Sequence, residues 1–191
     1  MTNKEARARR RPDGPPRVRL VEMTAPVLAA LKDGDTATAG RLVGATLGAH
    51  FADEEMRWLT GLRLDQLRAV PSRAGWLTDV VLDADDGRAV GHAGFHGPPD
   101  ERRRVEIGYS VLPELRRRGY ARAILAELLR RADASPEVAI VRASISPDNA
   151  GSLATIAGHG FERVGEQWDE RDGLEIVFER PAPPPRGNGE A

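Results

Sequence analysis

The sequence contains no cysteine, almost no lysine and few aromatic residues. Without cysteine the chain has no disulfide framework, no thiolate metal site and no cysteine nucleophile. Lysine occurs only at Lys4 and Lys32, so arginine carries nearly all of the positive charge. No apolar stretch reaches the roughly 20 residues that a membrane span requires, and no apolar segment of a signal peptide follows the basic N-terminus. These absences predict a cytoplasmic protein with no membrane partner.

Both ends of the chain differ in composition from its centre. The 191 residues are 40% hydrophobic with a net charge of -1, which is typical of one globular domain and does not favour nucleic acid. Residues 1–16 are rich in arginine and proline, and residues 181–191 are rich in proline and glycine. We therefore expect disordered tails around a domain at residues 17–180. The basic stretch Arg7–Arg11 could contact nucleic acid, but no aromatic residues are interleaved with it, which favours a solvated tail.

Hydrophobic periodicity and turn residues predict alternating strands and helices between the tails. Asp53 is a typical N-cap and Pro71 a typical stop for the helix between them, and Asp85-Asp86-Gly87 marks a hairpin turn. Strands are expected at residues 18–23, 76–83, 89–95, 105–112, 138–145, 161–168 and 174–179. Helices are expected at residues 25–31, 36–47, 53–70, 122–132 and 149–157. This order of elements predicts an α/β fold.

A basic glycine loop, Arg116-Arg117-Arg118-Gly119-Tyr120-Ala121, lies between an expected strand and an expected helix. Free N–H groups and the positive dipole end at a helix N-terminus favour an anion, and Gly119 lets the backbone approach it closely. The loop is not a Walker motif, since no Lys-Ser or Lys-Thr follows the glycine, nor a dinucleotide-binding fingerprint, since spaced glycines are missing. It suits a diphosphate, although arginine-rich helix starts with one glycine are also common as solvated surface.

Two motifs in this order resemble the GNAT superfamily of acyl-CoA-dependent N-acyltransferases. The first is the family's [Q/R]-x-x-G-x-[G/A] after a strand, here Arg116 to Ala121. The second is Asn149-Ala150-Gly151-Ser152 leading to Gly160-Phe161. The resemblance covers about residues 17–180. It implies a mixed, mainly antiparallel central sheet with helices on both faces.

The resemblance implies an N-acetyltransferase that moves an acetyl group from acetyl-CoA to a primary amine, either a small molecule or a protein N-terminus. The reaction would be a direct attack in a ternary complex without a metal ion, and members of the family often form homodimers. In the family, acceptor specificity comes from segments that correspond to about residues 25–70 and 166–173. An alternative of another class stays open, in which the same loop serves a non-catalytic acyl-CoA-binding or sensing module.

The resemblance also implies which residues hold the cofactor. Backbone groups of Val111 and Leu112 would meet the pantetheine arm, with the Val111 N–H polarising the thioester carbonyl. Asn149 and Ser152 would also contact this part of the cofactor. The pyrophosphate would bind the loop residues Arg116, Arg117, Arg118, Gly119, Tyr120 and Ala121.

Glu106 and Ser152 are the candidate catalytic residues. Glu106 resembles the glutamate that many members use to deprotonate the amine, often through water, while the residues alone equally allow a surface carboxylate. Many relatives carry a tyrosine as the acid seven residues after the motif asparagine, where this sequence has Ile156. Ser152 resembles the serine that some relatives place beside the sulfur, although Asn149 and Ser152 could equally cap a helix.

His92 and His96 lie on one face of an expected strand, as a candidate metal pair or an alternative base. Strand residues four apart are separated by roughly 13 Å, too far for one ion, so we expect no metal. His96 could line the acceptor cleft or could be a partly exposed polar residue. Tyr109 should point opposite to Glu106 and into the core.

Overall fold

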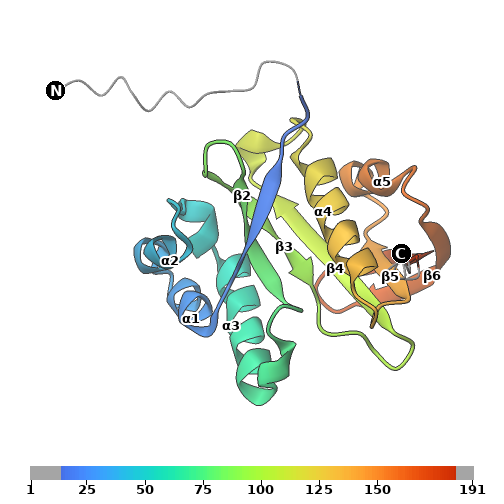
Figure 1. Cartoon of the computed structure of the whole chain (residues 1–191), viewed down its shortest axis with the longest axis horizontal. Helices are drawn as coiled ribbons and strands as arrows, with labels where there is room; N and C mark the ends of the chain where they lie inside the picture. The colour runs from blue at the N-terminus through green and yellow to red at the C-terminus, as the bar shows by residue number, and fades with distance from the viewer. Residues whose placement is uncertain (1–13, 184–191) are drawn as a thin grey trace, which may run out of the picture.

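The strands form one mixed sheet in the computed structural model, which describes residues 14–183 (Figure 1). Within these residues seven strands follow the order β1-β2-β3-β4-β5-β7-β6, and every neighbouring pair is antiparallel except β4 and β5. The strands are β1 (Val18–Glu22), β2 (Thr78–Asp83), β3 (Ala89–Phe95), β4 (Arg104–Val111), β5 (Ile140–Ile145), β6 (Glu162–Asp169) and β7 (Gly173–Pro181). The expected mixed, mainly antiparallel sheet is confirmed.

Helices cover both faces of the sheet, as expected. Arg63 of α3 hydrogen-bonds Thr78 on β2, whereas Arg131 of α4 pairs with Asp79, the next residue along that strand. Because neighbouring strand residues point to opposite faces, α3 and α4 lie on opposite faces of the sheet. The helices are α1 (Ala25–Lys32), α2 (Thr36–Val43), α3 (Glu54–Ala69), α4 (Tyr120–Ala134) and α5 (Ala150–Ile156), with short turns η1 (Ala49–Ala52), η2 (Pro71–Arg73) and η3 (Pro113–Leu115).

The core lies on both sides of the central strands. Val80 and Val81 are neighbours on β2 and both are 0% exposed, so that strand is buried on both of its faces. Leu28 of α1 and Leu128 of α4 are equally buried and cover it from the two helical layers. Burying such a side chain contributes about 1.5–3 kcal/mol, so helix packing on both faces stabilises the strands that carry the site.

Helix ends show where the local pattern predicted the structure and where it did not. Asp53 caps α3 as predicted, since its side chain accepts a hydrogen bond from the Met56 N–H at 2.8 Å. The helix expected to run to residue 47 ends at Val43. Gly44 takes a left-handed conformation (φ 71°) there, and its N–H bonds back to the Gly40 carbonyl.

The sheet extends beyond the expected C-terminal end of the domain. Strand β7 includes Pro181, and the Ala182 N–H donates to the Ala139 carbonyl at 2.8 Å. These residues were expected to begin a tail, so that boundary was too early. The rest of the two expected tails, residues 1–13 and 184–191, lies outside the described residues.

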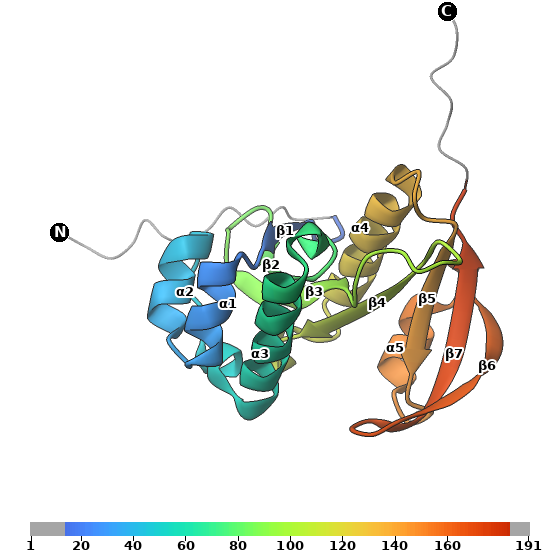
Figure 2. The ribbon, with the colours of Figure 1, turned by 90° about the horizontal axis from the view of Figure 1, so that it is seen from below.

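Strands β4 and β5 stay together over only part of their length. In the described part of the chain they pair in parallel only at Arg104, Val105 and Glu106 of β4. Beyond this point β4 continues to Val111 and β5 to Ile145, and Figure 2 shows the two strands diverging. The sheet is therefore split along part of the boundary between these two strands.

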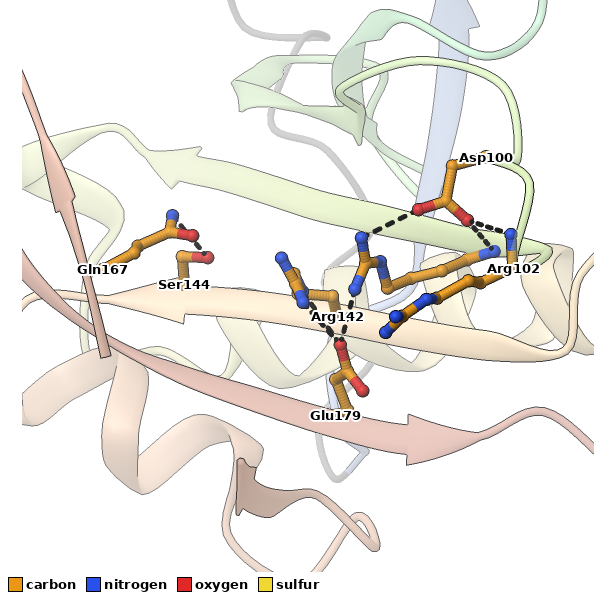
Figure 3. A network of polar contacts seen from close by, with 7 residues as sticks. Asp100, Arg102, Arg142, Ser144, Gln167 and Glu179 are labelled. Atoms are coloured by element: carbon orange, nitrogen blue, oxygen red, sulfur yellow. Dashed lines mark hydrogen bonds and ion pairs between the residues drawn. The ribbon is translucent and has the colours of Figure 1, made fainter. Parts of the chain in front are cut away.

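Polar contacts hold the joined end of this boundary together. Glu179 of β7 accepts hydrogen bonds from Arg142 Nη2 at 2.7 Å and from Arg104 Nη1 at 3.2 Å, so one carboxylate bridges β4, β5 and β7 (Figure 3). Asp100 accepts from the Arg102 N–H and pairs with the Arg104 guanidinium at 2.8 Å. We call Arg104, Arg142 and Glu179 the arginine clamp. Burial alone would raise the pKa of Glu179, but the hydrogen bonds from Arg142 and Arg104 outweigh it and lower that pKa.

We expect Glu179→Gln to lower the free energy of unfolding by about 1–3 kcal/mol, because two largely buried guanidinium groups lose a charged acceptor. Urea unfolding as a function of pH measures this loss. Since the folded-state pKa of Glu179 is depressed, its contribution is present above the unfolded-state pKa of about 4.3. It is lost as the pH falls through the folded-state pKa, so parent and variant should converge in acid.

The matched control for the clamp is Glu166→Gln. Glu166 pairs with Arg163 on an exposed part of β6, so its loss should cost less than about 1 kcal/mol. Equal losses in the two variants, or a difference for Glu179→Gln that persists in acid, would contradict the clamp.

Candidate functional site

The split between β4 and β5 leaves backbone groups of β4 unpaired. On its other side β4 is bonded to β3, with the His96 N–H donating to the Glu106 carbonyl at 2.9 Å and the Leu112 N–H donating to a β3 carbonyl at 2.8 Å. Backbone groups of successive strand residues point to alternate sides. Tyr109 and Val111 therefore direct their N–H groups toward the side that β5 has left.

Of the two residues expected to offer backbone groups to the pantetheine arm, Val111 alone has its N–H on that side. The Leu112 N–H is taken by the Val90 carbonyl, and the Leu112 carbonyl accepts from the Leu115 N–H at 2.8 Å. The expectation for Leu112 is corrected for this reason. The bond between the Leu112 N–H and β3 depends on the register of the two strands, which the local sequence does not specify.

The basic glycine loop joins β4 to α4 in a conformation that leaves its N–H groups free. Arg117 (φ 58°) and Gly119 (φ 87°) both take left-handed conformations, and the first hydrogen bond of α4 runs from the Ala123 N–H to the Gly119 carbonyl. Within residues 14–183, the N–H groups of residues 117–122 donate to no acceptor. Such groups at the start of a helix form an anion site, which the helix dipole strengthens.

Two side chains of the loop hold this backbone in place. Arg116 Nε donates to the Val111 carbonyl at 3.1 Å and so ties the loop to the end of β4. The buried Tyr120 donates its hydroxyl to Asp83 Oδ2 at 2.6 Å and accepts from Arg88 at 2.8 Å. These contacts direct the side chain of Tyr120 toward the β2–β3 turn, so the site at the loop is made mainly of backbone.

A cavity of about 670 Å³ lies beside the loop, between the start of the described chain and one face of α4. Its wall includes Pro16, whose Cδ lies 3.1 Å from the position that a Cβ on Gly119 would take. Part of the expected N-terminal tail therefore packs against the loop. Arg118 and Arg122 also line the cavity, and they make no ion pair within the described range. Glu127 and Arg130, which pair with each other, line it as well, so the charges of Arg118 and Arg122 are the part of the lining that favours an anionic group.

Glu106 meets His96 across the β3–β4 ladder. His96 Nδ1 and Glu106 Oε1 lie 3.8 Å apart, with the imidazole half exposed and the carboxylate 24% exposed. Partial burial lowers the pKa of His96 below its ordinary value of 6.5, although the Glu106 carboxylate opposes that shift. The carboxylate predicted as the base thus has a titratable neighbour.

Acidic side chains of the β6–β7 hairpin lie near this pair. Burial raises the pKa of Glu175; the hydrogen bond from Gln167 opposes this rise and the charge of Glu106 adds to it. The charges of Asp169 and His96 interact, and each favours the charged form of the other. Glu175 and Asp169 could not be identified from the sequence, since only the folded hairpin brings them near this pair.

The two segments expected to set acceptor specificity touch each other. The Arg171 guanidinium, in the turn of the β6–β7 hairpin, lies 3.8 Å from the centroid of the Trp58 ring on α3. This cation–π contact links the two sides of the split sheet. No local signal could have identified it, because the two residues lie far apart in the sequence.

Asn149 and Ser152 lie at the start of α5, directly after β5. Asn149 Oδ1 accepts a hydrogen bond from the Ser152 N–H at 3.0 Å, so the capping interpretation is confirmed for Asn149, whereas the Ser152 side chain makes no capping bond within the described residues. Within residues 14–183 the Asn149 amide nitrogen and the Ser152 hydroxyl have no partner and can bind a ligand. Ile156 is buried in the core, and Tyr109 points away from Glu106, as predicted.

The two histidines of β3 have different surroundings. His92 stacks against His50 with ring centroids 6.4 Å apart, and burial lowers its pKa to about 4. His96, just past the end of β3, faces Glu106 instead. Among the described residues no group of three or more His, Cys, Asp or Glu side chains is arranged to hold a metal ion. No helix of that range has both the length and the apolar character to cross a membrane.

Sequence comparisons place the chain among acetyltransferases. A family model described as the acetyltransferase (GNAT) domain matches residues 24–162. The uncharacterized N-acetyltransferase YjdG of Bacillus subtilis (strain 168) is 33% identical over 82 residues, which are 43% of this chain and 49% of YjdG. The chain spans about half the length of the curated relatives it matches.

Solved structures share the fold at low sequence identity. Mycobacterium smegmatis RimJ in complex with CoA-disulfide superposes with a TM-score of 0.61 at 23% identity, over 90% of this chain and 88% of that one. A phosphinothricin acetyltransferase from Sinorhizobium meliloti in complex with AcCoA gives 0.57 at 21% identity, over 86% and 88%. The structural likeness shows the fold, and the family model covers most of the sequence. The chain therefore belongs to the GNAT acetyltransferase family.

Proposed function

We propose that the protein is an N-acetyltransferase that moves an acetyl group from acetyl-CoA to a primary amine by direct attack in a ternary complex. The observation that carries this proposal is the run of unpaired N–H groups at residues 117–122, next to the split between β4 and β5. The unpaired N–H groups can donate hydrogen bonds to a pyrophosphate. The split between the strands suits the pantetheine arm, which can hydrogen-bond to the backbone of β4. Two fold neighbours were solved with CoA-disulfide and with AcCoA, which supports the same donor here.

The donor would lie along the path from the loop into the split. Its pyrophosphate would accept hydrogen bonds from the loop backbone around Gly119, with the charges of Arg118 and Arg122 beside it. The Val111 N–H would donate to the thioester carbonyl oxygen, where negative charge develops during attack. The free amide nitrogen of Asn149 would donate to the pantetheine arm.

The reaction needs a neutral amine. The acceptor ammonium loses a first proton, its nitrogen forms a bond to the acetyl carbon, and the C–S bond breaks to release the CoA thiolate. The nitrogen then loses a second proton, which balances the proton that the thiolate takes up. Glu106 would assist removal of the first proton, directly or through another group, and the Ser152 hydroxyl would donate to the departing sulfur. Positioning of the two substrates supplies much of the remaining rate.

The acceptor would be a small amine or a protein N-terminus. Fold neighbours include proteins named as a spermidine N-acetyltransferase and as a ribosomal L7/L12 alpha-N-protein acetyltransferase, one for each class. Glu175 and Asp169 add negative charge near Glu106, which favours a cationic acceptor.

Gly119→Glu should weaken acetyl-CoA binding about 100-fold or more in calorimetry, because a carboxylate and added bulk would occupy the anion site. Gly75→Glu is the matched control. Gly75 has a similar left-handed φ (80° against 87°), and a Cβ added there meets nothing within 4 Å. It lies before the start of β2, whereas the loop contacts Asp83 at the other end of that strand. The parent and the control should bind alike. If Gly119→Glu binds acetyl-CoA as tightly as the parent, or if the folded parent does not bind it, the proposed donor site at the loop is wrong.

Glu106→Gln should slow CoA release by about 10²-fold or more while leaving the affinity for acetyl-CoA unchanged. The assay detects free thiol with an amine panel taken from the neighbours' names: spermidine, phosphinothricin, and peptides with the N-termini of ribosomal proteins L7/L12 and S5. Glu162→Gln, an exposed position on β6, is the control and should behave like the parent. Unchanged turnover in Glu106→Gln would exclude Glu106 from the mechanism. Tight acetyl-CoA binding without acylation of any amine would favour a non-catalytic binding module.

A further inference from the structure

His96 lies directly across from Glu106 in the β3–β4 ladder. Its N–H donates to the Glu106 carbonyl at 2.9 Å, and the preceding pair in the register is Phe95 with Ile107. Opposite residues of antiparallel strands project their side chains from the same face. His96 Nδ1 then lies 3.8 Å from Glu106 Oε1, so one ring nitrogen faces the carboxylate and Nε2 lies on the other side of the ring.

Gly108 shows where Nε2 lies. A Cβ built on Gly108 would be only 2.6 Å from this nitrogen, so the imidazole lies over the backbone of Gly108. Gly108 is the next residue on the same face after Glu106, on the way to Val111, whose N–H points into the split. Within residues 14–183 His96 Nε2 has no hydrogen-bond partner. The free nitrogen is therefore placed between the carboxylate and the proposed position of the thioester.

Charges on several elements act on this ring. Partial burial lowers the pKa of His96 and Arg63 of α3 lowers it further, while Glu106 of β4 and Asp169 of β6 raise it. Arg63 also donates a hydrogen bond to the His96 carbonyl at 3.0 Å, so its guanidinium is held close to His96. Glu175 of β7 lies near Glu106. With a lowered pKa the imidazole is neutral at pH 7 and can take up a proton. The imidazolium formed would face the Glu106 carboxylate.

We propose that His96 is a catalytic residue of the acetyl transfer, an inference that rests on the proposed function. Nε2 takes a proton from the acceptor ammonium, and the freed lone pair of the amine forms the C–N bond to the acetyl carbon. The C–S bond breaks, the nitrogen loses its second proton, and the thiolate takes up a proton in exchange through the Ser152 hydroxyl or water. Glu106 stabilises the imidazolium until it returns its proton to solvent. An imidazole has its pKa closer to neutrality than an ordinary carboxylate, which makes it the more effective base.

Two variants test the position of the ring. His96→Gln should lower kcat about 10²-fold or more with acetyl-CoA affinity unchanged in calorimetry. Gly108→Ala changes no charge and needs no left-handed backbone, yet its methyl would displace the imidazole and lower kcat about 10-fold or more. The control is Gly97→Ala, next to His96, where an added Cβ meets nothing within 4 Å and kcat should stay at the parent value. Parent-like kcat in either test variant overturns the proposal.

The pH profile of kcat separates the two assignments of the base. Activity of the parent should fall in acid as His96 becomes protonated. Glu106→Gln removes a charge that raises the pKa of His96, so this acid limb should move to lower pH, whereas His96→Gln should abolish it. An acid limb that is lost in Glu106→Gln and kept in His96→Gln would make Glu106 the base and overturn the proposal.

A second measurement needs no acceptor. NMR titration of the histidine ring signals in the full chain, assigned with His96→Gln, should show a lower pKa for His96 in Glu106→Gln and an unchanged one in Glu162→Gln. If the pKa of His96 is unchanged in Glu106→Gln, the two groups do not interact and the proposal is overturned. A parent that binds acetyl-CoA and acylates no amine would contradict acetyl transfer itself, while the titration still decides whether the two groups interact.

Discussion

The separation of β4 from β5 is the constraint on which the rest of the site depends. In a continuous sheet the two strands would satisfy each other's N–H and C=O groups along their whole length. Here the ladder ends at Glu106, so the N–H groups of Tyr109 and Val111 on that side are left for another partner, while the Val111 carbonyl accepts from Arg116 Nε. The arginine clamp bridges β4, β5 and β7 at the joined end and so keeps the two halves of the sheet in register while the other end diverges.

The glycine loop after β4 also leaves backbone N–H groups without a partner in the described part of the chain. Its side chains at Arg116 and Tyr120 are tied to the end of β4 and to the β2–β3 turn, while its N–H groups stay free. A preorganised set of backbone donors needs no rearrangement to receive an anion, and the helix dipole adds to its attraction. In the proposed function, the loop and the split would together place the acyl group beside the face of the sheet that carries Glu106 and His96. Binding and chemistry would then depend on one feature of the topology.

Features set by a few neighbouring residues could be predicted from the sequence. The Asp53 cap follows from a local side-chain preference, and the structure has it. The mixed, mainly antiparallel sheet was implied by the resemblance to the GNAT superfamily, and the structure has it as well. Contacts between distant segments could not be predicted, because periodicity does not fix which residues of two strands face each other. The partnership of Glu106 with His96 follows from strand register in this way. Strand register also directs the Leu112 N–H to β3, although backbone groups of Leu112 were expected to meet the pantetheine arm.

The most direct test of this account is a crystal structure of the protein with CoA bound. We expect pyrophosphate oxygens about 2.7–3.2 Å from N–H groups of residues 117–122. The pantetheine arm should lie in the split, beside Val111. CoA bound only in the cavity between Pro16 and α4, or strands β4 and β5 paired beyond Glu106 in the complex, would contradict the account.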